Sequence, residues 1–138
     1  MIRAIGKHTD IVAVNDYDRN APVARLAAVS KLTGRPVMVT EFSFKAADSG
    51  LPNTNGAGEP VATQKDRADL WQAFITDLTR MPECVGWHWF EHCDEPKEGR
   101  FDGENSNYGL VRIDDTPWET LTERMKAVNP TLAGVHGG

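Results

Sequence analysis

Three side chains in the sequence could together process a sugar: the carboxylate of Glu41, the phenol of Tyr17 and the indole of Trp89. Each follows a short apolar segment, so strand alternation could bring all three to one side of a sheet. A carboxylate can act as nucleophile or base, and a phenol can orient it through a hydrogen bond. An indole offers a flat face for a pyranose ring. The plainer alternative for Glu41 is a strand end that reaches water.

The elements that would position these residues alternate between strand and helix. Three apolar runs predict strands at 11–14, 37–42 and 83–92. Three segments with helical spacing predict helices at 21–36, 63–82 and 116–129. Such alternation predicts an α/β fold whose parallel strands are joined by right-handed crossovers.

Two predicted helices begin with capping signals. Thr63 with Asp66 resembles a capping box. Thr116 is expected to cap the last helix, with Pro117 at its first position and Glu119 closing the box. The charges at 64–69 are expected to form a solvated helix face.

Two long polar segments, 43–62 and 93–109, are expected to be loops at the carboxyl end of the sheet, where Glu41 also lies. Ligands bind at that end in α/β folds. Strict alternation would place Val37 and Val39 on the same side as Glu41. This side would also carry Tyr17 and Trp89.

Composition excludes several classes of partner. The 138 residues are 40% hydrophobic and 25% charged, with a formal net charge of −5. No basic stripe is present, so neither nucleic acid nor a membrane surface is an expected partner. No apolar run approaches the roughly 20 residues of a membrane span. Residues 1–10 lack the apolar core of a signal peptide, so a cytoplasmic location is expected.

The cysteines and histidines are the natural candidates for a metal site. Cys84 and Cys93 are expected to be reduced thiols at the ends of one strand. His88 and His92 have the spacing of a zinc motif that normally lies on a helix, but here the spacing falls on a strand. Alternation places both histidines on the outer side against the helices, so no metal site is expected.

Five segments in order resemble a known family: "VAVNDYDRN", "RPVMVTEFSFKAADSGLPNTNGAG", "TQKDRADLW", "VGWHWFEHCDEP" and "NYGLVRIDDTPWETL". They resemble the C-terminal part of retaining (β/α)8-barrel glycoside hydrolases with two catalytic glutamates, agarase-like or β-galactosidase-like. The resemblance covers residues 8–130. It implies a partial TIM-type barrel with about three βα units over 1–130, corresponding to strands six to eight, and a flexible tail at 131–138.

The resemblance also implies roles for individual residues. Glu41 aligns with the nucleophile, Tyr17 with the tyrosine that holds it, and Trp89 with the platform of the −1 sugar subsite. Further sugar contacts are expected from Asn15, Glu91 and Asp94, and also from Asn53 and Asn55. No metal or organic cofactor is expected.

The family's second glutamate, the acid/base on strand four, is usually preceded by asparagine, and no Asn-Glu pair occurs in these residues. Retaining hydrolysis needs two carboxyl groups. We therefore expect the chain alone to be inactive, or nearly so, on poly- or oligosaccharides unless a complete site forms.

The missing strands would leave open sheet edges and an inner face carrying Val37, Val39, Trp87 and Trp89. A homo-oligomer that buries these surfaces is therefore expected. Two alternatives remain open. The chain could be a non-catalytic carbohydrate-binding or self-assembling half-barrel module, or a truncated product whose fold depends on self-association.

Overall fold

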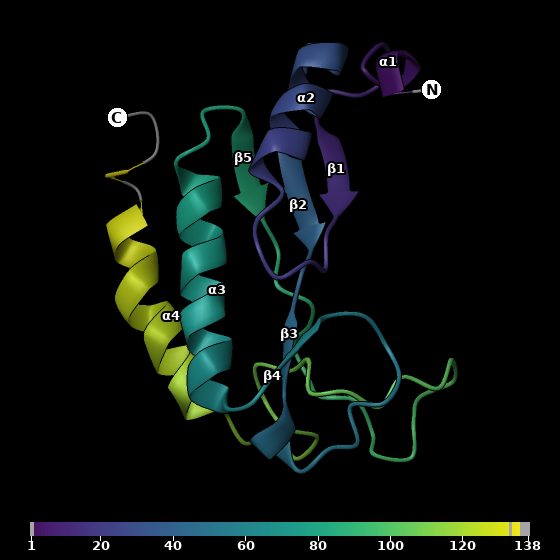
Figure 1. Ribbon diagram of the computed structural model, residues 1–138, viewed down its shortest axis with the longest axis vertical. Coiled ribbons are helices and arrows are strands. Elements are labelled where there is room, and N and C mark those ends of the chain that lie inside the picture. The colour runs from purple at the N-terminus through teal and green to yellow at the C-terminus, as the bar shows by residue number, and fades with distance from the viewer. Residues whose placement is uncertain (1, 133, 136–138) are drawn as a thin grey trace.

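The computed structural model describes residues 2–132 and 134–135 of the chain. Its central sheet has three parallel strands in the order β1–β2–β5 (Figure 1): β1 (Val12–Asn15), β2 (Val37–Glu41) and β5 (Cys84–Trp87). The helices are α1 (Ile2–Ile5), α2 (Val23–Thr33), α3 (Gln64–Thr79) and α4 (Glu119–Leu132). The predicted α/β class with parallel strands and βα units is confirmed.

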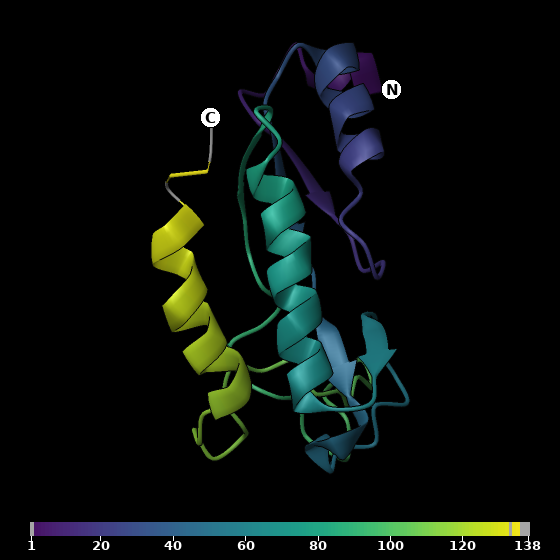
Figure 2. The same ribbon diagram turned by 60° about the vertical axis from the view of Figure 1, so that its left-hand side comes forward.

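One face of this sheet is covered by helices. Helices α2 and α3 cover that face, and α4 packs beside α3 (Figure 2). The core between them is apolar and fully buried, and includes Leu26 of α2 and Phe74, Ile75 and Leu78 of α3. Burying each of these side chains contributes about 1.5–3 kcal/mol. None of the described helices has the length and apolarity needed to cross a membrane.

The segment 43–62, expected to be a loop, contains two short strands. These are β3 (Phe44–Ala46) and β4 (Glu59–Val61), which pair in parallel and are separated by a 3-10 turn, η1 (Ala47–Ser49). Strands of three residues are too short for a periodic pattern to develop, so they could not be predicted from the sequence.

A β-bulge changes which side chains share a face of β2. Val14 pairs with Val39 and Asn15 pairs with Glu41, so Thr40 is an extra residue on β2. Val37 and Val39 are 0% exposed and belong to the core under the helices. Phe42 lies on that same side, with its ring stacked on Phe74 at 4.4 Å. The expectation that Val37 and Val39 share a side with Glu41 is therefore wrong, because alternation is broken at Thr40.

The pairing of β5 is also irregular. Val37 pairs with Cys84 and Val39 pairs with Trp87. Between these two pairs β5 therefore has one more residue than β2. Trp87 and Trp89 pack against the core that contains Val37 and Val39, so their expected grouping with the valines holds, whereas the expected uncovered inner face is wrong. His88 and His92 are exposed, so their expected burial against the helices is wrong. Cys84 and Cys93 are both free thiols.

The two capping predictions have different outcomes. Thr63 and Asp66 form the predicted capping box, with Asp66 N donating to Thr63 Oγ1 at 3.1 Å and Thr63 N donating to Asp66 Oδ2 at 3.0 Å. The box at Thr116 is wrong, because α4 begins only at Glu119 and Pro117 bridges to Val111 instead. Of the expected tail, residues 131–132 belong to α4, whereas 133 and 136–138 lie outside the described residues.

Candidate active site

The structure brings Tyr17 and Glu41 together at the carboxyl ends of β1 and β2. The phenol of Tyr17 donates a hydrogen bond of 2.7 Å to Glu41 Oε2. The backbone is fixed as well, since Asp16 N donates to Glu41 O at 2.9 Å. Because the bulge at Thr40 separates Glu41 from the buried valines, its half-buried carboxylate lies beside the phenol rather than under the helices.

Tyr17 is held in its protonated form. Burial raises the pKa of its phenol, and the hydrogen bond to Glu41 raises that pKa further, as do the charges of Glu41 and Glu104. The ring meets Phe90 edge-on, with centroids 6.1 Å apart. Tyr17 is thus a fixed hydrogen-bond donor to the carboxylate.

Trp89 lies just beyond β5 in a segment that continues alongside β2. His88 N donates to Val39 O and Phe90 N donates to Phe42 O, both at 2.9 Å. The indole Nε1 donates to Tyr108 O at 2.8 Å, and the half-buried ring meets Phe42 edge-on at 5.4 Å. The orientation of the indole is therefore set by its neighbours.

Arg67 is a supporting residue that sequence analysis missed. It is 0% exposed, although the charged run containing it was expected to be solvated. Its guanidinium donates to Phe44 O at 2.8 Å and Gly109 O at 2.9 Å, and lies 5.2 Å from the Trp89 ring centroid. Burial lowers the pKa of Arg67, and the charge of Asp94 opposes that change. Only the three-dimensional fold distinguishes this arginine from its solvated neighbours.

Glu91 occupies an acidic cluster around one guanidinium. Arg100 Nη1 lies 2.7 Å from Glu95 Oε1 and 3.5 Å from Glu91 Oε1, and the same group also binds Asp102 and Glu104. Burial, followed by the hydrogen bond to Glu95, raises the pKa of Glu91 to about 8. A neutral carboxyl at this position can donate a hydrogen bond, which an ionised one cannot.

The other predicted sugar contacts are placed differently. Asn15 is exposed at the end of β1, where its Oδ1 accepts from Thr40 Oγ1 at 2.8 Å. Asp94 is buried, and its carboxylate accepts three hydrogen bonds, from Asn107 Nδ2 and Trp118 Nε1 at 2.8 Å and from Gly109 N at 2.7 Å. Asp94 thus links three parts of the chain, and this placement does not favour its predicted sugar contact.

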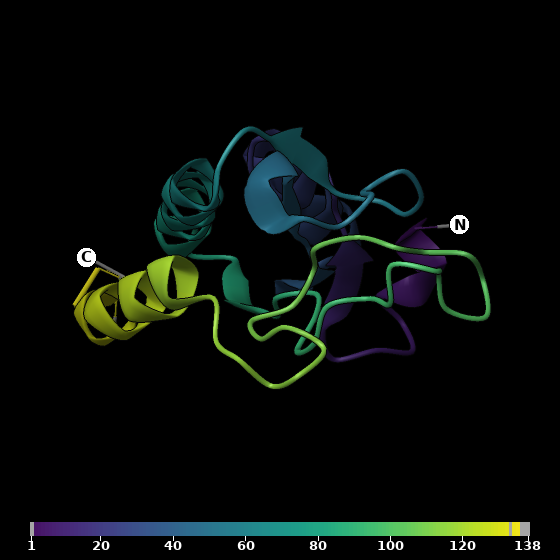
Figure 3. The ribbon, with the colours of Figure 1, turned by 90° about the horizontal axis from the view of Figure 1, so that it is seen from below.

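Asn53 and Asn55 join the two long polar segments, which run beside each other below the sheet (Figure 3). Asn53 Oδ1 accepts from Asn107 N at 2.7 Å, and Asn55 Nδ2 donates to Gly103 O at 3.1 Å. Tyr108, which sequence analysis also missed, donates its hydroxyl to Ala57 O at 2.7 Å. The Tyr108 ring also meets the Phe90 ring, with centroids 5.2 Å apart. The hydrogen bonds between the segments occupy much of the hydrogen-bonding capacity of both asparagines.

A separate hollow of about 350 Å³ lies on the other side of the second polar segment. Its lining includes Leu51, Pro96, Ile113 and Trp118, with Arg112 stacked on the Trp118 ring at 3.8 Å. Neither Glu41 nor Tyr17 lines it. Among the described residues, no group of three or more His, Cys, Asp or Glu could hold a metal ion.

A carboxylate fixed by a phenol can perform nucleophilic attack on a sugar. The indole of Trp89 interacts with Phe42, Arg67 and the backbone of Tyr108, so the structure does not bring it into contact with this carboxylate. The hydrogen bond from Tyr17 orients Oε2, and no described residue hydrogen-bonds the other carboxylate oxygen. Retaining glycosidases place a second carboxyl group about 5–5.5 Å from the nucleophile. In the described part of this chain, the side chain that hydrogen-bonds the Glu41 carboxylate is instead the phenol of Tyr17.

Comparisons with known proteins relate the chain to agarases. The chain is 35% identical over 127 residues to β-agarase B of a Vibrio species, strain JT0107, and covers 13% of that protein. It aligns with the solved structure of an exo-β-agarase at a TM-score of 0.90 and 31% identity, over 99% of this chain and 19% of the other. No protein-family model matches the chain.

A more distant likeness concerns the fold alone. A β-galacturonidase from Eisenbergiella tayi aligns at a TM-score of 0.64 and 15% identity over 93% of this chain. The chain is thus similar, over nearly its whole length, to one part of agarase-type glycoside hydrolases, and it spans about an eighth of the length of β-agarase B.

Proposed function

We propose that this chain is the nucleophile-bearing part of a retaining agarase-type glycoside hydrolase, equivalent to strands six to eight of its barrel. Glu41 is the nucleophile, Tyr17 positions it, and Trp89 forms a platform for the sugar at the −1 subsite. The observation that carries this proposal is the 2.7 Å hydrogen bond from Tyr17 to Glu41 at the carboxyl ends of parallel strands. The match to agarases over nearly the whole chain supports it.

In the proposed reaction Glu41 attacks the anomeric carbon and forms a covalent glycosyl-enzyme, which water then hydrolyses. A protonated carboxyl must give its proton to the leaving oxygen and afterwards activate the water. This second carboxyl comes from the other strands of the barrel, and the reaction needs no metal or organic cofactor. The 138 residues alone therefore give little or no turnover of agar oligosaccharides.

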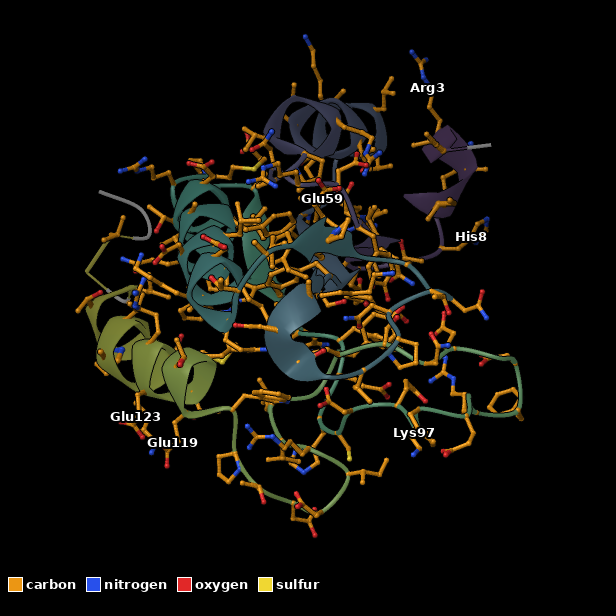
Figure 4. All side chains as sticks on the ribbon, turned by 60° about the horizontal axis from the view of Figure 1, so that its bottom comes forward. Arg3, His8, Glu59, Lys97, Glu119 and Glu123 are labelled. Atoms are coloured by element: carbon orange, nitrogen blue, oxygen red, sulfur yellow. The ribbon has the colours of Figure 1, made fainter. Side chains whose placement is uncertain are left out.

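The test compares the chain alone with the chain joined to the preceding part of a β-agarase. The joined protein is expected to release reducing sugar from agar, and Glu41→Gln to lower its kcat by at least about 10³-fold. Glu123→Gln serves as the matched control, because this carboxylate lies on the outward side of α4 (Figure 4) and is 64% exposed. Strong turnover by the chain alone, or by the Glu41→Gln protein, contradicts the proposal.

The partly exposed indole of Trp89 favours a second candidate, a carbohydrate-binding module without catalysis. Such a module would bind agar oligosaccharides equally well before and after Glu41→Gln, and would stay inactive in the joined protein. Calorimetric titration of both forms separates the two functions.

A further inference from the structure

Phe101 stands out on the second polar segment because its ring is almost fully exposed. It is 97% exposed, and among residues 93–109, all of which the structure describes, no other large apolar side chain is exposed. Aromatic side chains are usually buried, because exposing the ring to water costs free energy. The turn that carries Phe101 extends away from α3 and α4 (Figure 3). A ring in this position is available to a binding partner.

The backbone around Phe101 is fixed as a tight turn. Gly103 N donates to Arg100 O at 2.8 Å, and Arg100 N donates to Glu104 O at 2.9 Å. Gly99 and Gly103 have left-handed φ values of 90° and 87°, and a Cβ on Gly99 would lie 3.2 Å from Gly103 O. Little conformational freedom is therefore lost when a ligand binds the ring.

Phe101 ends a row of side chains that begins at the candidate active site. The Tyr17 ring, whose hydroxyl binds Glu41, meets the Phe90 ring with centroids 6.1 Å apart. The Arg100 guanidinium, held by four carboxylates, lies 5.8 Å from the centroid of Phe90 and 5.7 Å from that of Phe101. Every member of this row is half-buried or exposed, so a ligand bound at Glu41 can continue along it.

The surroundings of Phe101 suit a sugar better than a protein surface. A sugar ring has an apolar face that packs on an aromatic ring, and hydroxyl groups at its edge that need hydrogen-bonding partners. Asp102 is exposed next to Phe101, and the exposed side chain of Asn55 is held against the turn by its 3.1 Å hydrogen bond to Gly103 O. A protein partner would instead need a wider apolar patch around the ring.

We infer that Phe101 is a platform for a distal sugar unit of the oligosaccharide substrate, so that the glycan runs from Glu41 along this row to Phe101. The inference rests on the proposed function, because that function supplies the glycan. Since several side chains separate Phe101 from Glu41, the sugar on Phe101 is not the one that Glu41 attacks. Phe101 is thus a specificity-determining residue that selects long agar oligosaccharides over short ones.

Calorimetric titration measures this selection in the chain joined to the preceding part of a β-agarase, with Glu41→Gln so that bound oligosaccharides stay intact. The ligands are an agar tetrasaccharide and an agar octasaccharide. Phe101→Ala should lower the affinity for the octasaccharide about tenfold and change that for the tetrasaccharide less than about twofold. Phe101→Trp keeps a flat aromatic face and should bind the octasaccharide as the original does. Ile113→Ala is the matched control, because Ile113 is 62% exposed at the separate hollow, and it should change neither affinity.

Three outcomes would overturn the inference: equal loss of affinity for both lengths, no loss for either, or full octasaccharide affinity in Phe101→Leu, which keeps an apolar group without a flat ring. The proposed function is scored separately, because binding is measured without turnover. A joined protein that needs Phe101 to bind the octasaccharide but does not cleave agar keeps the platform and removes the catalytic role. One that cleaves agar although Phe101→Ala changes neither affinity does the reverse, and failure to bind either oligosaccharide overturns both.

Discussion

Tyr17 and Glu41 form the one contact on which the account depends at the scale of single residues. Both lie near the ends of apolar strands, and their side chains suit sugar chemistry, so their contact could be predicted from the sequence. The placement of Asp94 could not be predicted, because an acidic residue after a strand looks the same in sequence whether it faces a substrate or accepts three internal hydrogen bonds. Arg67 was missed because burial of a charge has no local sequence signal.

Replacing Tyr17 with Phe removes the donor while keeping the ring that meets Phe90. In the joined protein we expect kcat to fall about 10- to 100-fold with little change in KM, because the carboxylate loses its orientation but not its neighbours. Steady-state kinetics on agar oligosaccharides gives both constants. A rise in KM with unchanged kcat would instead make Tyr17 a substrate-binding residue.

Glu91 makes the stability of the fold depend on pH. The pKa of this carboxyl is about 8 in the folded chain against an ordinary value of 4.5, so only the folded state holds the proton between these values. Stability therefore falls as pH rises from 4.5 to 8. Glutamine keeps this position neutral, so Glu91→Gln should lack that fall.

Urea unfolding at pH 4 and pH 9 measures the effect of Glu91→Gln. The variant should match the original chain at pH 4 and exceed its stability by about 1–2 kcal/mol at pH 9, a value reduced for solvent screening of this partly exposed group. Glu98→Gln, whose side chain is 72% exposed, is the control and should leave the difference between the two pH values unchanged. Equal loss of stability in all three proteins would show that Glu91 ionises normally.

At the scale of elements, the strands and helices with regular sequence patterns could be predicted. The features that depend on irregular backbone geometry could not. The strands, the long helices and the capping box at Thr63 follow from periodicity and end signals. The bulge at Thr40 has no such signal, yet it separates the face of Glu41 from the face of Val39. Pro117 marked a helix start in sequence, but the chain uses it in a bridge with Val111.

Gly56 allows the two polar segments to meet. Its φ is 104°, and a Cβ at this position would overlap the hydroxyl of Tyr108 and lie 3.1 Å from Cδ of Glu104. We expect Gly56→Ala to destabilise the chain by about 2–4 kcal/mol, since backbone strain and overlap add. Thermal or urea unfolding measures this loss.

Gly50 is the matched control for that substitution. Its φ of 81° is also left-handed, but nothing lies within 4 Å of a Cβ there. Gly50→Ala should therefore cost only about 1–2 kcal/mol. Similar losses for the two variants would mean that the contact with Tyr108 adds nothing to the strain.

At the scale of the whole molecule, the helices cover one face of the sheet and leave the other open. The sequence indicated open edges correctly but assigned the wrong residues to the open face, because Val37 and Val39 were counted there and Ile11 and Val85 were not.

Covalent trapping tests the central claim most directly. The chain, completed by the rest of a β-agarase barrel, is incubated with an agar oligosaccharide that carries a fluoride leaving group and a fluorine at C2 of the reacting sugar. Such a substrate needs little acid assistance to form the glycosyl-enzyme, which then hydrolyses slowly. Mass spectrometry of the digested protein should find the sugar on Glu41 and should find none after Glu41→Gln. An adduct on another carboxylate, such as Glu91, or turnover of agar without any adduct, would contradict the account.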